Sequence, residues 1–166
     1  DFRWPIIYWF KERIPWLNRK NQSGISVKSY QTERDNRYLE LMPVLIDYMN
    51  REKPYLNPRL RQADVAVALG ISVHELSQLL NNRMHVSFPD FINGFRVQAF
   101  KERIKEDEWH KYTLIAVAMQ CGFSSKTSFI RTFKKITGLT PSDYLKQLQD
   151  SGEDSEAVLK EESETE

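Results

Sequence analysis

Residues 120–141 combine side-chain types that suit contact with a charged polymer: QCGFSSKTSFIRTFKKITGLTP. The stretch holds three phenylalanines, four lysines and arginines, and no acidic residue. Basic and hydroxyl side chains can bind phosphate oxygens and base edges, while phenylalanines at helical spacing can bury one face of a helix. The chemistry indicated is recognition of a polyanion.

The sequence carries no arrangement typical of catalysis. It lacks a phosphate-binding glycine loop, a paired-carboxylate motif and a nucleophile motif. One cysteine and three scattered histidines do not make a zinc site. Cys121 ends an alanine-rich stretch against a glycine, which favours a small buried side chain over a reactive thiol. We therefore expect no enzyme activity, no metal and no cofactor.

The charge of the chain is unevenly distributed. The formal net charge is +1, but residues 150–166 hold eight of the 23 acidic residues and one of the 24 basic residues. Residues 1–149 therefore carry a net charge of +8, which suits a polyanion, whereas the tail repels one. The tail has too few apolar residues to build a core, and we predict that it is disordered.

The part of the chain with helical apolar spacing, residues 38–149, contains an internal repeat. ADVAVALGISVHELSQLL aligns with LIAVAMQCGFSSKTSFIRTF when Gly70 is placed on Gly122 and one residue is inserted after the second glycine. Beyond the insertion the offset is constant at 53 residues. The pairs include Leu76 with Phe129, Leu80 with Phe133, Ser87 with Thr140, and Asp90 with Asp143.

In each copy the predicted elements follow one another in the order of a helix-turn-helix. A short helix rich in alanine and valine runs into a glycine that permits a tight exit, and a serine then caps the next helix. The second helix of such a unit enters the DNA major groove. We predict an all-α fold of about seven helices, with helix-turn-helix units at about 60–83 and 113–136 and a linking helix at about 88–105. A helical protein-interaction module without DNA readout is the alternative.

The predicted linking helix sets the spacing of the two units. Phe91, Ile92, Phe95, Phe100 and Ile104 lie on or near one apolar face of it. At 1.5 Å per residue the helix is roughly 27 Å long, close to the roughly 34 Å between major grooves on one face of B-DNA. We therefore expect one chain to place two recognition helices in successive grooves.

The segment GFSSKTSFIRTFKKITGLTPSDYLK resembles the signature of the AraC/XylS transcriptional regulators. The pattern is carried by Gly122, Phe123, Phe129, Arg131, Phe133, Lys134, Lys135, Gly138, Thr140, Pro141 and Tyr144. The resemblance extends back to about Leu41, and Phe100 departs from it, because many members have alanine there. It implies the C-terminal DNA-binding domain of a longer regulator, with double-stranded DNA and RNA polymerase as partners and a sensor domain upstream.

The spacing and the resemblance together assign roles to the residues of the second repeat. Phe123, Phe129 and Phe133 recur at spacings of six and four and are expected in the core. The resemblance places the opposite face in the groove, with base contacts from Ser125, Lys126, Thr127, Ile130 and Arg131, and phosphate contacts from Ser124, Lys134 and Lys135. For Arg131, an intramolecular ion pair that positions the helix is the alternative. Thr140 and Pro141 are predicted to begin the final helix.

The equivalent face of the first repeat holds Val73, His74, Ser77, Gln78 and Asn81. The amides of Gln78 and Asn81 have the geometry to bind adenine N6 and N7, and the resemblance expects a base or sugar contact at His74. Phosphate contacts are expected from Arg59, Arg61, Ser72 and Arg83. A solvated surface is the alternative for these side chains.

The first 37 residues have a different composition. Residues 1–20 hold three of the four tryptophans with several basic residues, and residues 21–37 are polar and indicate a linker. Tryptophan and tyrosine favour the membrane interface, and basic residues favour its cytoplasmic side. We interpret this region as the cytoplasmic exit of an upstream membrane-embedded sensor, which would tether a cytoplasmic protein to the inner membrane. Docking on the DNA-binding domain, homodimerisation and the end of a soluble sensor are the alternatives.

Overall fold

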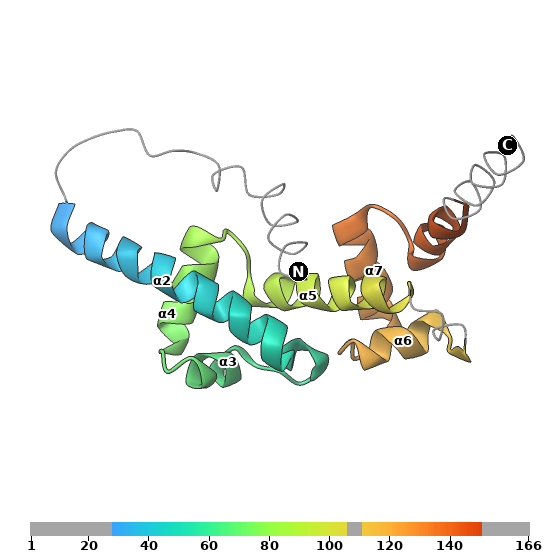
Figure 1. The fold of residues 1–166 in the computed structure, drawn as a ribbon, viewed down its shortest axis with the longest axis horizontal. Helices are drawn as coiled ribbons and strands as arrows, with labels where there is room; N and C mark the ends of the chain where they lie inside the picture. The colour runs from blue at the N-terminus through green and yellow to red at the C-terminus, as the bar shows by residue number, and fades with distance from the viewer. Residues whose placement is uncertain (1–27, 106–110, 151–166) are drawn as a thin grey trace, which may run out of the picture. The chain divides into compact units, whose positions relative to one another are not determined.

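The computed structural model describes residues 28–105 and 111–150, and side chains from residue 36 onward. The elements are α2 (Lys28–Glu52), η2 (Pro54–Leu56), α3 (Gln62–Ala68), α4 (Val73–Gln78), η3 (Leu79–Arg83), α5 (Phe88–Arg103), α6 (Leu114–Gln120) and α7 (Lys126–Thr137), followed by a helix over residues 141–150 (Figure 1). The described residues form helices and no strand, which confirms the all-α class. The predictions for residues 1–27 and for residues 151–166 of the tail lie outside the described residues.

The chain divides into two compact units, with the boundary between Gln98 and Ala99 inside α5. The first unit contains α2, α3, α4 and η3, and the second contains α6, α7 and the helix over residues 141–150. Each unit therefore holds one copy of the repeat. Helix α5 lies where the linking helix was predicted and contributes residues to both cores.

Helix α2 begins earlier than the sequence predicted. A polar linker was expected through residue 37, but residues 28–37 belong to this helix, which is 25 residues long. No glycine or proline occurs between residues 28 and 42, so nothing in the backbone interrupts a helix there. Tyr38, Leu45 and Met49 anchor the helix in the core of the first unit, and polar residues with adequate helix propensity extend it.

The buried stripe of α2 is narrow. Val44 is 53% exposed, because it lies about 100° around the helix from the buried Leu45. The helix ends at Glu52, ahead of Pro54, because the ring of a proline disfavours the helical conformation in the residue before it. Pro43 lies within α2 on its exposed face, where water can satisfy the carbonyl that proline leaves without a helical donor.

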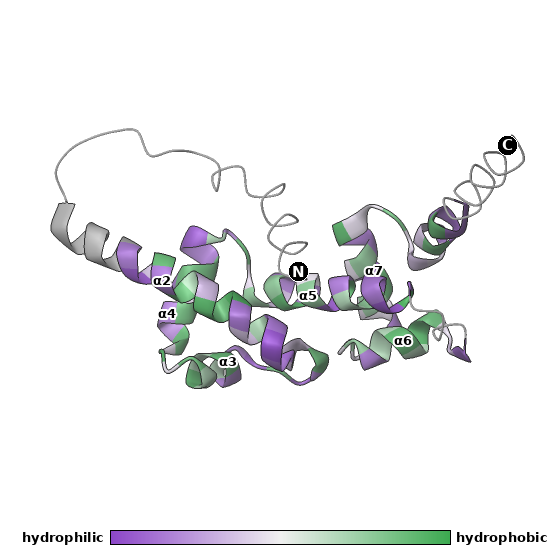
Figure 2. Cartoon of the chain, viewed as in Figure 1, coloured by the Kyte–Doolittle hydropathy of each residue, from purple (hydrophilic) through white to green (hydrophobic). Residues whose placement is uncertain are grey.

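The second unit has an aromatic core. The ring centroid of Phe129 lies 4.7 Å from that of Phe100, 5.1 Å from that of Phe123 and 5.7 Å from that of Phe133. All four side chains are buried, which confirms the inward prediction for the three phenylalanines of the repeat. Phe100, the departure from the family pattern, fills this core from α5. Helix α6 is almost wholly apolar, whereas α7 alternates polar and apolar residues (Figure 2).

No single helix in the described ranges has the length and apolar character to cross a membrane, and the one pair that passes when joined, Gln62–Ala68 with Val73–Arg83, is bent by 109°.

Candidate nucleic-acid interface

The same turn joins the two helices of each repeat. After α3, Gly70 has a φ of +65°, and the Ile71 amide donates to the Ala66 carbonyl at 3.0 Å. After α6, Gly122 has a φ of +92°, and the Phe123 amide donates to the Ala118 carbonyl at 3.2 Å. Glycine tolerates this left-handed backbone without a steric penalty, so both first helices end in the same hydrogen-bonded turn.

The helix after each recognition helix begins with the same cap. Ser87 Oγ accepts from the Asp90 amide at 3.2 Å and donates to its carboxylate at 3.0 Å. Thr140 Oγ1 accepts from the Asp143 amide at 3.2 Å and donates to its carboxylate at 2.5 Å. These pairs stand 53 residues apart in the sequence, so the aligned repeat corresponds to repeated hydrogen bonding.

The first recognition helix consists of α4 and the π-helical turn η3. Ser72 caps it by accepting from the Glu75 amide at 3.1 Å, and a Glu75 carboxylate oxygen accepts from the Ser72 amide at 2.9 Å. Hydrogen bonds from the Ser72 backbone and hydroxyl lower the pKa of Glu75 below its ordinary value. Ser72, predicted to bind phosphate, is therefore engaged in this cap.

The side chains predicted to read bases from the first recognition helix are bonded to one another in pairs. Gln78 Nε2 lies 2.8 Å from His74 Nε2, and Asn81 Nδ2 donates to Ser77 Oγ at 3.1 Å. Each pair is one helical turn apart. His74 and Asn81 are exposed, while Ser77 and Gln78 are half-buried.

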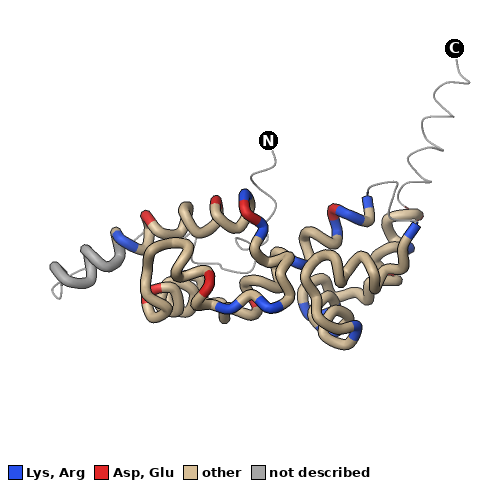
Figure 3. The backbone as a smooth tube through the Cα atoms, turned by 90° about the horizontal axis from the view of Figure 1, so that it is seen from below, with Lys and Arg blue, Asp and Glu red and all other residues tan. Residues whose placement is uncertain are grey.

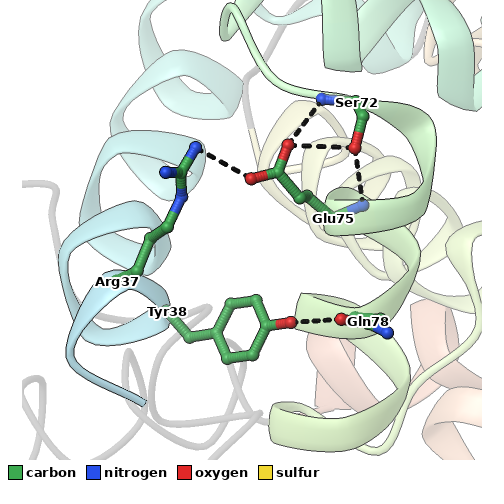
Figure 4. A network of polar contacts seen from close by, with 5 residues as sticks. All are labelled: Arg37, Tyr38, Ser72, Glu75 and Gln78. Carbon is green, nitrogen blue, oxygen red and sulfur yellow. Dashed lines mark hydrogen bonds and ion pairs between the residues drawn. The ribbon is translucent and has the colours of Figure 1, made fainter. Parts of the chain in front are cut away.

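Arg37 and Tyr38 of α2 form polar interactions with this recognition helix, and neither was predicted from the sequence. Arg37 lies 2.8 Å from a Glu75 carboxylate oxygen, and the Tyr38 hydroxyl donates to Gln78 Oε1 (Figure 4). The sequence placed Arg37 in a predicted linker, so no sequence pattern indicated that this residue lies on a helix and faces α4. Tyr38 was recognised only as the start of a helix.

The second recognition helix, α7, is more basic than the first. It carries Lys126, Arg131, Lys134 and Lys135 and no acidic residue, whereas α4 and η3 carry Glu75 and Arg83. Figure 3 colours the basic and acidic residues along the described backbone. Ser125 is the residue that caps α7, by accepting from the Ser128 amide at 3.2 Å. The electrostatic attraction for phosphate is therefore concentrated on α7.

The predicted contact residues of α7 divide by exposure. Lys126, Thr127 and Arg131 are exposed, and Ile130 is half-buried. Among the described residues no acidic side chain forms an ion pair with Arg131. Ser124, Lys134 and Lys135, predicted to contact phosphate, are exposed.

The arginines that flank the first repeat differ in their surroundings. The Arg61 guanidinium donates to Asp64 at 2.8 Å, and this hydrogen bond lowers the pKa of the Asp64 carboxyl. The guanidinium carbon of Arg83 lies 5.9 Å from the centroid of the Tyr38 ring, within cation–π range. Arg59 is exposed. Arg61 is exposed as well, and Arg83 is half-buried.

A family model for a helix-turn-helix domain, of the AraC type, matches residues 65–147, which is half of the chain. The chain belongs to this family. The match starts within α3 and ends in the last helix, so it covers the second repeat and all but the first residues of the first repeat, while α2 lies outside it.

Relatives of this AraC-type domain are much longer proteins. The HTH-type transcriptional regulator YtdP of Bacillus subtilis is 22% identical over 138 residues, which are 83% of this chain and 17% of the relative. An HTH-type transcriptional regulator of Staphylococcus aureus is 35% identical over 86 residues, which are 51% of this chain and 11% of the relative. The chain thus spans less than a fifth of the length of either protein.

Two solved structures resemble the AraC-type domain. A protein from Listeria innocua aligns with a TM-score of 0.51 at 27% identity, over 64% of this chain and 94% of that one. A DNA-binding transcriptional dual regulator from Escherichia coli K-12 aligns with a TM-score of 0.52 at 22% identity, over 62% of this chain and 92% of that one. The second likeness concerns the fold alone.

Proposed function

We propose that this chain is the DNA-binding part of a transcription regulator and reads double-stranded DNA with two recognition helices, α4 with η3 and α7. The observation that carries the proposal is the repeated unit itself. This chain, a member of the AraC-type family, has two turns with the same hydrogen bonds. Each turn is followed by a capped helix whose outer side chains are polar. An ordinary helical hairpin does not require this repetition.

The two recognition helices have different roles in this proposal. Helix α7 supplies most of the attraction for phosphate, because its four basic residues are not balanced by an acidic one. Arg131 binds guanine O6 and N7, while Lys134 and Lys135 at the end of the helix bind phosphates. The first recognition helix is electrically balanced and contributes mainly hydrogen bonds from His74, Ser77, Gln78 and Asn81 to base edges.

The wider partners form the less direct part of the proposal. Contact with RNA polymerase, a sensor region elsewhere in the protein and a cytoplasmic location follow from the family resemblance. A membrane tether or a dimer contact through residues 1–37 depends mostly on residues 1–27, which lie outside the described ranges. Co-sedimentation of the chain with anionic vesicles, compared with a form starting at Ser26, tests the tether.

The proposal is tested by selecting bound sites from a random duplex library and then measuring affinity against salt concentration. We expect one enriched site with two blocks of preferred bases about one helical turn, roughly 10 base pairs, apart. Affinity should fall steeply with salt, because phosphate neutralisation releases counterions. A chain that enriches no sequence and shows no salt dependence would instead be a protein-interaction module.

A further inference from the structure

Helix α2 holds the first recognition helix at two adjacent points. Arg37 and Tyr38 are consecutive on α2, and their partners Glu75 and Gln78 are one turn apart on α4 (Figure 4). The Tyr38 ring is only 5% exposed, and the guanidinium of Arg83 lies over it. The phenol is therefore held firmly while its hydroxyl reaches a side chain predicted to read bases.

The Gln78 amide is engaged at both ends. Its oxygen accepts from the Tyr38 hydroxyl, and its nitrogen, which can only donate, lies 2.8 Å from His74 Nε2. A glutamine amide has two N–H donors and an oxygen that can accept two hydrogen bonds. One donor and one acceptor thus remain, which is the set that binds adenine N7 and N6.

We propose that Tyr38 is a specificity-determining residue of the first helix-turn-helix unit, which acts by positioning the Gln78 amide for base readout. This inference rests on the proposed DNA-binding function. Tyr38 lies on α2, outside the residues 65–147 that match the family model, so the reading surface depends on a residue beyond that domain.

The physical basis is restriction of a flexible side chain before binding. A free glutamine side chain has three rotatable bonds, and its amide can turn over to offer either a donor or an acceptor at a given point. Ordering such a side chain on binding costs conformational entropy, and a held amide has lost part of that freedom already. An amide held in one orientation also binds an incorrect base poorly, because the amide cannot rotate to match the donors and acceptors of that base.

The substitution Tyr38→Phe tests this, because it removes the hydroxyl and retains the buried ring. Tyr48→Phe is the matched control, since it removes the same atom from the same helix and no hydrogen bond from Tyr48 occurs among the described residues. Both changes are made in the 166-residue chain, alone and together with Gln78→Ala. Melting temperatures establish that each variant folds.

The first measurement needs no DNA. In a two-dimensional 15N–1H NMR spectrum, the side-chain amide signals of Gln78, assigned by their loss in Gln78→Ala, should shift in Tyr38→Phe and stay in place in Tyr48→Phe. Unchanged signals in Tyr38→Phe would overturn the proposal. This result is independent of whether the chain binds DNA.

The second measurement compares dissociation constants for the selected site and its single-base variants. At the base pair whose preference disappears in Gln78→Ala, Tyr38→Phe should reduce discrimination by about five- to tenfold, and affinity for unrelated duplex should change by less than about twofold. In the Gln78→Ala background, Tyr38→Phe should have no further effect, because the two residues act through one contact.

The remaining outcomes each decide against the proposal. Discrimination that rises in Tyr38→Phe would mean that Tyr38 withholds Gln78 from DNA. Equal losses in Tyr38→Phe and Tyr48→Phe, or a base preference unaffected by Gln78→Ala, would also overturn it, although specific binding through α7 would survive. If the unmodified chain shows no sequence preference, the proposed function itself fails, whatever the NMR signals show.

Discussion

Arg96, on α5, donates from Nε to the backbone carbonyl of Tyr55 at 2.8 Å. A terminal nitrogen of the same guanidinium donates to the carbonyl of Asn57 at 2.9 Å, so Arg96 holds both carbonyls of the segment that follows α2. Burial lowers the pKa of Arg96 from its ordinary value, because the charged form is partly removed from water. The Tyr55 ring also stacks on Phe95, with centroids 5.4 Å apart, so this segment is fixed on α5 from two sides.

The first prediction is that Arg96→Met lowers the free energy of unfolding by about 2 kcal/mol, because two carbonyls lose a charged donor and one of them belongs to a buried residue. Urea unfolding followed by circular dichroism measures it. Arg59→Met is the control, since Arg59 is exposed and its side chain forms no hydrogen bond or ion pair in the described part of the chain. Equal effects of the two changes would refute the structural role of Arg96.

The second prediction concerns pH and the cap of the first recognition helix. The pKa of Glu75 is lower in the folded chain than its ordinary value, so the carboxylate stabilises the fold at pH values above that ordinary value. This contribution is lost as the pH falls through the lowered pKa, because the carboxyl becomes protonated. The glutamine of Glu75→Gln cannot ionise, so this variant should be less stable than the native chain at neutral pH, and the difference should shrink in acid.

Urea unfolding at neutral and acidic pH measures this difference. Glu40→Gln serves as the control, because Glu40 is exposed on α2 and forms no ion pair with the described residues. A stability difference for Glu75→Gln that is the same at every pH would show that the charge of Glu75 has no part in the cap.

The third prediction separates base contact from phosphate contact on α7. Arg131→Ala should weaken binding to the selected site by about 1–3 kcal/mol and relax the preference in one block of bases. Lys134→Ala should weaken binding to all sequences alike and reduce the salt slope by about 0.9, because one phosphate contact is lost. Fluorescence anisotropy at several salt concentrations measures both. A uniform loss for Arg131→Ala would assign it to the backbone.

The fourth prediction is that the eight acidic residues of the tail compete with DNA for the basic part of the chain. Deleting residues 150–166 should strengthen binding to nonspecific duplex, and the gain should shrink as salt rises, because screening weakens the competition. Filter binding at about 50 mM and 200 mM salt measures the effect. The same affinity with and without the tail at the lower salt concentration would exclude this competition.

The sequence alone determined the parts of this protein that depend on neighbours in the chain. The turn at Gly70 and Gly122 and the caps at Ser72 and Thr140 involve residues within about five positions of one another, so residue type decides their geometry. The buried phenylalanines of α7 follow from helical spacing in the same way.

Tertiary structure decided the contacts between distant segments. Tyr38 meets Gln78 across 40 positions, and Arg96 meets Tyr55 across 41. No local preference signals such pairs, because each side chain has an ordinary place on its own helix and only the packing of α2 and α5 in the first unit brings the partners together. For the same reason α2 extends through a polar segment that composition indicated as a linker: its buried residues lie further along the chain, and a helix anchored at one end can continue where nothing in the backbone interrupts it.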